Sequence, residues 1–174
     1  MNEDGKYYGK FRGSVISNID PEFRGRLLVS VPDVLSLLPS TWAEPCIPLA
    51  GPPGPGMGSY FVPPIGAGLW VEFEYGDPSR PIWVGCRWGQ SAPVPPLAMT
   101  GLPTSPNIVL QTLGQNSLVV SDLPGPTGGI MLKSASGATL IVNDTGIYLQ
   151  NGKGASVTLV GSSVIINEGA LMVT

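Results

Sequence analysis

The sequence predicts an all-β protein in which a small barrel is followed by a rod of short strands. Helical periodicity is absent along the 174 residues, and stretches in which apolar and other residues alternate take its place. A second observation is a repeat near the C-terminus, where eight apolar-x-apolar pairs recur every 7 to 12 residues. Turn formers, with 24 glycines and 19 prolines in all, separate these stretches.

The alternating stretches in residues 1–90 predict a closed barrel of the OB type. In the second stretch Leu27, Val29 and Val31 occupy every other position, as the residues on one face of a strand do. The segment Gly-Asp-Pro-Ser-Arg-Pro at 76–81 predicts a hairpin between the last two strands. Five short strands in so small a segment suit an OB-fold barrel. The strands are expected at 9–19, 26–32, 42–47, 69–75 and 82–88.

Two proline-rich segments lie outside these strands. Residues 48–68 form a long loop, and a loop of this length inside a compact domain is usually functional or docked on a partner. We expect it to pack against a neighbouring subunit. Residues 91–106 are uncharged and rich in proline, which predicts an extended, semi-rigid linker between barrel and rod.

The eight apolar pairs predict eight short strands in residues 107–174. At three strands per coil they give fewer than three coils, and a solenoid needs about three repeats to be stable. One chain therefore buries this pattern poorly, and a three-fold oligomer closing a prism is favoured. A monomeric β-meander or small sandwich is the alternative. The pairs are Ile108/Leu110, Leu118/Val120, Ile130/Leu132, Leu140/Val142, Ile147/Leu149, Val157/Leu159, Val164/Ile166 and Leu171/Val173.

The central pairs of the repeat are the predicted core of the trimer. Their side chains would point toward the three-fold axis, because residues i and i+2 of a strand share one face. Burying each Val, Leu or Ile is worth about 1.5–3 kcal/mol relative to exposure. The residues assigned to the trimer core are Ile130, Leu132, Leu140, Val142, Ile147, Leu149, Val157, Leu159, Val164 and Ile166.

The residue types of the chain argue against catalysis. Histidine is absent, so Ser/His/Asp and Cys/His nucleophiles cannot form. Cys46 and Cys86 lie in apolar stretches and are expected to be buried free thiols, not a disulfide or a zinc site. Glu72 and Glu74 are interpreted as a solvated barrel face, not as a carboxylate pair that cleaves sugars. We expect no catalytic residues, no metal and no cofactor.

Charge and hydropathy bear on partners and location. The net charge of −3 provides no basic field for nucleic-acid phosphates, so no nucleic-acid partner is expected. The acidic stretch 1–5 is no secretory signal, and no stretch approaches the roughly 20 apolar residues that span a bilayer. Synthesis and assembly in the cytoplasm are therefore expected.

A set of motifs with ordered spacing covers about 80 residues of the barrel segment, and its most specific part is the Gly-Asp-Pro hairpin. The motifs are Tyr8-Gly9-x-x-x-Gly13-x-Val15, Asp20-Pro21-x-x-x-Gly25-Arg26-Leu27-x-Val29-x-Val31-Pro32, Trp42-Ala43-x-Pro45, Pro48-x-Ala50-Gly51, Pro64-x-Gly66 and Trp70-Val71-Glu72-Phe73-Glu74-x-Gly76-Asp77-Pro78-x-x-Pro81-Ile82-Trp83-x-Gly85. With these motifs the segment resembles the baseplate assembly protein V family of contractile phage tails, whose members are relatives of the type VI secretion spike VgrG.

The resemblance implies a structural central spike in a phage virion or related injection particle. The OB barrels of a homotrimer would form a ring under a baseplate hub protein. The C-terminal strands would twine into an intertwined, triple-stranded β-helix, or β-prism. Sheath contraction would drive the spike through an envelope, so membrane contact would be transient. The alternative is an OB-fold protein that binds nucleic acid or glycan and oligomerises through its β-rod.

The end of the rod is the expected docking platform for a separate tip protein. The apolar pattern continues through Leu171 and Val173 to the final residue, which would leave open strand edges and an apolar triangle in a trimer. Some relatives end in a histidine-bearing apex that holds iron, and this chain has no histidine. The resemblance therefore implies a PAAR-type tip protein at the C-terminal end. The platform comprises Asn167, Glu168, Gly169, Ala170, Leu171, Met172, Val173 and Thr174.

Overall fold

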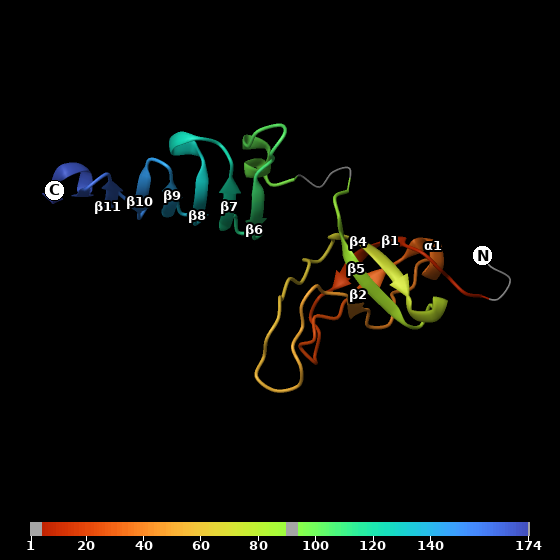
Figure 1. Cartoon of the computed structure of the whole chain (residues 1–174). Helices are drawn as coiled ribbons and strands as arrows, with labels where there is room; N and C mark the ends of the chain where they lie inside the picture. The colour runs from red at the N-terminus through yellow and green to blue at the C-terminus, as the bar shows by residue number, and fades with distance from the viewer. Residues whose placement is uncertain (1–4, 90–93, 174) are drawn as a thin grey trace. The chain divides into compact units, whose positions relative to one another are not determined.

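The computed structural model describes residues 5–89 and 94–173, and the chain divides into two compact units, Met1–Ala92 and Pro93–Thr174. Strands make up most of the regular structure of both units (Figure 1). The all-β class expected from the sequence is confirmed. The first four residues and Thr174, the last residue of the expected tip platform, lie outside the described residues, as do positions 90–93 at the start of the expected linker.

The first unit is a five-stranded sheet with the spatial order β2-β1-β4-β5-β3. All neighbours are antiparallel except β3 and β5, which run parallel. The two edges of the sheet meet where Leu27 and Ala43 exchange backbone hydrogen bonds of 3.1 and 2.8 Å. This bridge brings β2 beside β3 and curls the sheet around its core. The strands are β1 (Phe11–Ser17), β2 (Leu28–Ser30), β3 (Glu44–Pro45), β4 (Gly68–Phe73) and β5 (Pro81–Arg87).

The core of the first unit follows the alternation of its strands. On β4, Leu69, Val71 and Phe73 are buried, while the residues between them face outward. Trp83 of β5 is also buried, and its indole N–H donates to the Gly25 carbonyl at 3.1 Å. The nine buried residues of this core are Val15, Leu27, Val29, Val31, Ala43, Leu69, Val71, Phe73 and Trp83.

Two short helical turns modify the predicted strands. Residues 32–35 form the one-turn helix α1 (Pro32–Leu35), which no periodicity could reveal because it is a single turn. The fourth strand ends at Phe73, and the 3₁₀ turn η1 (Glu74–Gly76) follows it. Tyr75 in this turn has φ 53° and is exposed, so the expectation that the strand extends to residue 75 is wrong.

The two cysteines are free thiols, as expected, but both are exposed in the single chain. The expectation that they are buried is therefore wrong for the chain by itself. Cys46 lies just beyond the short strand β3, and Cys86 lies near the end of β5, where the alternation is interrupted by a bulge opposite β4. Neighbouring atoms still desolvate the Cys86 thiol and raise its pKa.

The long loop between β3 and β4 contains a hairpin that we call the arm, residues 49–59. Gly51 donates its N–H to the Met57 carbonyl at 2.7 Å, and Ser59 donates to the Leu49 carbonyl at 3.0 Å. In Figure 1 this segment projects from the sheet as a narrow loop. The arm is thus a defined element with its own backbone hydrogen bonds.

The proline-rich segment before the second sheet is folded, not extended. Residues 96–100 form the 3₁₀ helix η2 (Pro96–Thr100). The Asn107 side-chain amide fixes it by donating to the Leu97 carbonyl at 2.8 Å and to the Thr100 hydroxyl at 3.0 Å. The expectation of an extended linker is therefore wrong for the described part of this segment.

The second unit is one eight-stranded antiparallel sheet in which every strand pairs with its neighbours in sequence. Each predicted apolar pair lies in a strand of its own, so the eight expected strands are confirmed. Within one chain they form a meander, not coils of three strands (Figure 1). The strands are β6 (Ile108–Gln111), β7 (Ser117–Ser121), β8 (Gly129–Lys133), β9 (Thr139–Asn143), β10 (Gly146–Gln150), β11 (Ser156–Val160), β12 (Ser163–Ile166) and β13 (Leu171–Val173).

Candidate oligomerisation interface

The register of the second sheet aligns the apolar pairs into two rows that cross all eight strands. Directly paired residues of neighbouring strands point to the same face of a sheet, so both rows share one face. We call it the two-row face. One row is Leu110, Leu118, Leu132, Leu140, Leu149, Val157, Ile166 and Leu171. The other is Ile108, Val120, Ile130, Val142, Ile147, Leu159, Val164 and Val173.

The ten residues predicted to form the trimer core all lie in these rows, on strands β8 to β12. In the single chain this face is largely uncovered, since Leu132 and Leu149 are 48% and 50% exposed. The core of the first unit, by contrast, reaches 5% exposure at most. Burial of these ten residues in a trimer remains a prediction, and the structure adds that they form one continuous apolar surface.

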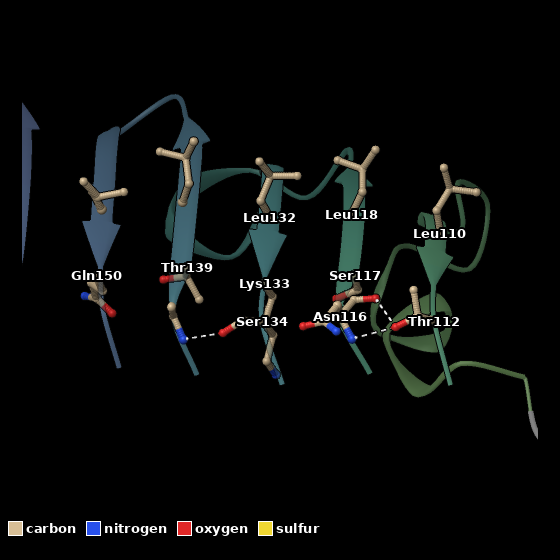
Figure 2. A pocket seen from close by; sticks show the side chains of 13 residues that line it. Leu110, Thr112, Asn116, Ser117, Leu118, Leu132, Lys133, Ser134, Thr139 and Gln150 are labelled. Atoms are coloured by element: carbon tan, nitrogen blue, oxygen red, sulfur yellow. Dashed lines mark hydrogen bonds between the residues drawn. The ribbon is translucent and has the colours of Figure 1, made fainter. Parts of the chain in front are cut away.

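Figure 2 shows part of this surface at close range. Leu110, Leu118 and Leu132 stand in a line, each pointing to the same side of its strand. Polar residues, among them Asn116 and Ser134, lie at the strand ends beside the line. A shallow hollow of about 540 Å³ runs over the leucines and this polar rim. Such an arrangement, an apolar floor with a polar border, is typical of a protein–protein interface.

Asparagine-based turns hold the strands in this register. The Asn143 side-chain oxygen accepts the N–H of Thr145 at 2.9 Å, which closes the tight turn between β9 and β10. The Asn151 side-chain oxygen similarly accepts the N–H groups of Lys153 and Ala155 at 2.8 and 3.0 Å. Turns of this kind fix the pairing, because slipping a strand by one residue would turn its apolar pair to the other face.

Residues on the opposite face were not singled out by the sequence analysis. The middle residue of several pairs is itself apolar, and the register places Val119, Met131 and Ile141 in one row. Val119 is only 3% exposed. The sequence contains these positions as runs of three apolar residues. The apolar-x-apolar pattern takes only the outer two residues of each run into account. Near this row the hydroxyls of Ser117 and Thr139 are buried without a hydrogen-bond partner in the described residues.

The expected tip platform forms the last turn and the edge strand of the sheet. Residues 167–169 form the 3₁₀ turn η4 (Asn167–Gly169), and the Asn167 side-chain oxygen accepts the Ser156 N–H at 3.0 Å. Leu171 and Val173 of β13 are both more than half exposed. Strand β13 pairs with β12 on one side, and no described strand pairs with its other side. The platform thus includes an open sheet edge.

A buried ion pair organises the loop between β1 and β2 in the first unit. The Arg26 guanidinium donates to the Asp20 carboxylate at 2.7 Å, and both side chains are almost fully buried. The same carboxylate accepts the backbone N–H groups of Glu22 and Arg24 at 3.0 and 2.8 Å. The hydrogen bond from Arg26 and those from the backbone hold the pKa of Asp20 well below its usual range. These contacts give Asp20 and Arg26 of the sequence motif a structural role.

The carboxylates considered for catalysis do not share a site. Glu72 pairs with Lys10, whereas Glu74 lies beyond the strand in η1 and pairs with Arg80. Among the described residues, no three His, Cys, Asp or Glu side chains gather in a way that could hold a metal ion. No helix in the described part of the chain is long and apolar enough to cross a membrane.

Two protein-family models match the chain, one on each unit. Residues 11–88 match the type VI secretion system/phage-baseplate injector OB domain, and residues 107–172 match the phage baseplate V C-terminal trimerisation domain. The chain belongs to the phage baseplate V family. No curated protein matches the chain significantly.

The two matches agree with the geometry of this baseplate V protein. The OB-domain match covers the curled sheet of the first unit, so the OB assignment is confirmed. The trimerisation-domain match spans all the described strands of the second unit, including the whole two-row face except Val173. The families concerned are structural components of baseplates, and the trimerisation domain supports a homotrimer. The chain is accordingly a structural baseplate component.

Proposed function

We propose that this protein is the homotrimeric central spike of a contractile injection machine, and that it joins the baseplate hub to a membrane-piercing tip. The observation that carries the proposal is the uncovered two-row face. It extends across all eight strands of a segment that matches a trimerisation domain. Three such faces turned toward a common axis would form a closed apolar core.

The size of the two-row face is sufficient to hold three chains together. Each strand contributes two apolar side chains, and burial of one from full exposure is worth about 1.5–3 kcal/mol. Association costs on the order of 4–15 kcal/mol in lost freedom of motion. Even if each side chain is only half exposed in the single chain, the burial free energy summed over eight strands exceeds this cost and favours assembly. In this trimer the three sheets would form the intertwined β-helix, or β-prism, expected from the sequence.

The proposed role of the spike is mechanical. The OB unit would contact the hub protein, and residues 167–174 would bind a PAAR-type tip, so that force from sheath contraction passes along the trimer. Contact with a membrane would be transient, during piercing. We infer that the chain is made in the host cytoplasm. We also infer that it has no catalytic activity, because Glu72 and Glu74, the carboxylates considered for catalysis, form separate ion pairs with Lys10 and Arg80.

The oligomeric state of the purified protein tests the proposal. Light scattering should give three times the 18.1 kDa of one chain, and the assembly should resist SDS or heat. Reconstitution with the sheath, tube and hub proteins of the same particle should then place the trimer at the particle's axis. A monodisperse monomer at micromolar concentration would contradict the proposal, because its two-row face would be left in water.

A further inference from the structure

Two of the five arginines of the chain, Arg12 and Arg87, form no ion pair with any described residue. Both lie on strands of the first sheet, β1 and β5. The other three arginines have carboxylate partners within the unit. These pairs are Arg24 with Glu22 and Glu44, Arg26 with Asp20 and Glu22, and Arg80 with Glu74. Arg12 and Arg87 are therefore the arginines whose charge is free for a partner outside the described chain.

The register of the sheet brings both arginines beside Trp70 of β4. Arg12 lies directly opposite Trp70, and its guanidinium carbon is 6.0 Å from the centroid of the ring. Gly68 shares the outer face of β4 with Trp70, because residues i and i+2 of a strand point the same way. A Cβ atom on Gly68 would lie 3.1 Å from Cγ and 3.5 Å from Cζ of Arg87, its partner in β5. Two cations from neighbouring strands thus lie beside one indole, and we call these three residues the arginine–tryptophan cluster.

The cluster has unused binding capacity. The Nε atom of Arg87 is buried and has no acceptor among the described residues. A buried donor without an acceptor is unfavourable, so an acceptor supplied by a partner would be bound favourably. Gly85, opposite Trp70 on β5, leaves the other side of the indole open, since an added Cβ atom would meet nothing within 4 Å.

The charge around the cluster selects an anionic partner. In the adjoining row of the same face, Lys10 pairs with Glu72. With Arg12 and Arg87 this part of the face carries three cations and one carboxylate, a net charge of +2 on a chain whose net charge is −3. A local charge of the opposite sign to that of the whole chain favours a partner that brings carboxylates or phosphates to this face.

A carboxylate fits the cluster better than a nucleic-acid strand does. The planar fork of a guanidinium matches the two oxygens of a carboxylate, and the indole covers the aliphatic carbons beside them. A nucleic acid needs a track of cations along its phosphates. Here the cations end at Glu72, whose carboxylate would repel the next phosphate.

We propose that the arginine–tryptophan cluster is the docking site for a carboxylate-bearing segment of the hub protein. This inference rests on the proposed function, in which the OB unit contacts the hub. The hub carboxylate accepts hydrogen bonds from Arg12 and Arg87, and the carbons next to it pack on Trp70. Charge complementarity of this kind sets the orientation of the partner and speeds its association.

Binding of the full-length trimer to the purified hub protein of the same particle tests the proposal. The double variant Arg12→Gln and Arg87→Gln should bind the hub about tenfold more weakly or worse, because both charge-assisted hydrogen bonds are lost. Added salt should weaken the parent more than this variant, since exposed charges are screened. Arg12→Gln is also measured alone. Its side chain is exposed, so the fold is not disturbed, and the affinity should still fall several-fold.

The matched control is the double variant Arg24→Gln and Arg80→Gln. It removes the same two charges by the same substitution, from side chains that are both 54% exposed and already paired with carboxylates. Hub binding should stay at the parent level. An equal loss in the two double variants would mean that net charge alone governs binding, and this would overturn the docking site.

Three further outcomes separate the docking site from the spike. Parent-level hub binding by the Arg12/Arg87 variant overturns the docking site and leaves the spike intact. Loss of the trimer in that variant, or binding of a labelled single-stranded DNA that only the parent retains, assigns the cluster to another partner and also overturns the docking site. A parent trimer that does not bind the hub overturns both the docking site and the proposed joining of hub to tip.

Discussion

Leu140 of β9 and Leu149 of β10 lie directly opposite each other in the middle of the two-row face. Their outer neighbours in the same row are Leu132 and Val157. Leu149 is half exposed in the single chain, whereas Leu140 is partly buried. The exposed part of the Leu149 side chain is available for association. A substitution at Leu149 is therefore expected to affect assembly directly.

A charge at this pair should prevent assembly, while the first unit, which has its own buried core, remains folded. Leu149→Asp would bring three carboxylates together near the axis of the trimer, where desolvation and mutual repulsion oppose ionisation. We expect the trimer to be lost at neutral pH and to recover partly as the pH falls, because only the protonated form is tolerated there. Light scattering measures the mass, and tryptophan fluorescence checks that the first unit remains folded, because all four tryptophans lie in it.

The matched control for this substitution is Asn151→Asp in the adjoining turn. An aspartate retains the side-chain oxygen that accepts the N–H groups of Lys153 and Ala155. The trimer should therefore form normally. If both variants assembled equally well, the two-row face would not be the inner surface of the assembly.

The buried Asp20–Arg26 pair should make the first unit sensitive to acid. The pKa of Asp20 is depressed in the folded chain, so its contribution to stability is complete above the ordinary aspartate pKa and declines as the pH falls below about 4. We expect Asp20→Asn to lower the melting temperature at neutral pH and to flatten its dependence on pH in the acidic range. Tryptophan fluorescence isolates this unit, because all four tryptophans lie between residues 42 and 88.

The control for the acid effect is Asp33→Asn, at an exposed carboxylate in the first turn of α1. It should leave the melting temperature within a degree or two of the parent at each pH, as expected for a surface substitution. An equal loss of stability in the two variants would show that the Asp20 carboxylate has no special role in the fold.

Gly129 at the start of β8 should tolerate no side chain. Its φ is +85°, and a Cβ atom would lie 2.1 Å from the Val142 carbonyl oxygen of the neighbouring strand. Gly129→Ala should therefore disrupt the pairing of β8 with β9 and reduce the yield of heat-resistant trimer several-fold. Gly114→Ala provides the comparison, since its nearest contact would be at 3.7 Å in an open turn. Thermal melting of the two variants tests this, and equal melting temperatures would contradict the prediction.

The strands of the second unit could be predicted from the sequence because each apolar pair is a complete local signal. Ile147 and Leu149, for example, are followed by the turn formers Asn151 and Gly152, so both the strand and its end are apparent. The core strands of the OB unit were similarly evident from positions such as Leu69 and Val71. Two alternating residues and a turn suffice for a strand of this length.

Features set by contacts between distant residues could not be predicted in this way. The fold of the proline-rich segment depends on Asn107, which reaches back to Leu97. The exposure of Cys46 depends on how early β3 ends. Pairing of each strand with its neighbours in sequence, as a meander, is also not encoded in the apolar pairs, which fit a coil equally well. Local periodicity specifies the face of a residue but not its partner.

The open edge of β13 leads to the last prediction, that the end of the sheet binds the tip protein. Leu171 and Val173 are exposed there, and an exposed apolar edge strand is a template for pairing with another chain. Deleting residues 169–174 should abolish capture of the PAAR-type tip in a pull-down while the trimer stays intact, because the other seven strands keep both rows. The double variant Leu171→Lys and Val173→Lys, in the full-length chain, should also lose capture of the tip while the trimer stays intact. Val160→Lys, at a similarly exposed valine on the opposite face, should bind the tip normally. Retention of the tip by the truncated trimer would show that docking uses another surface.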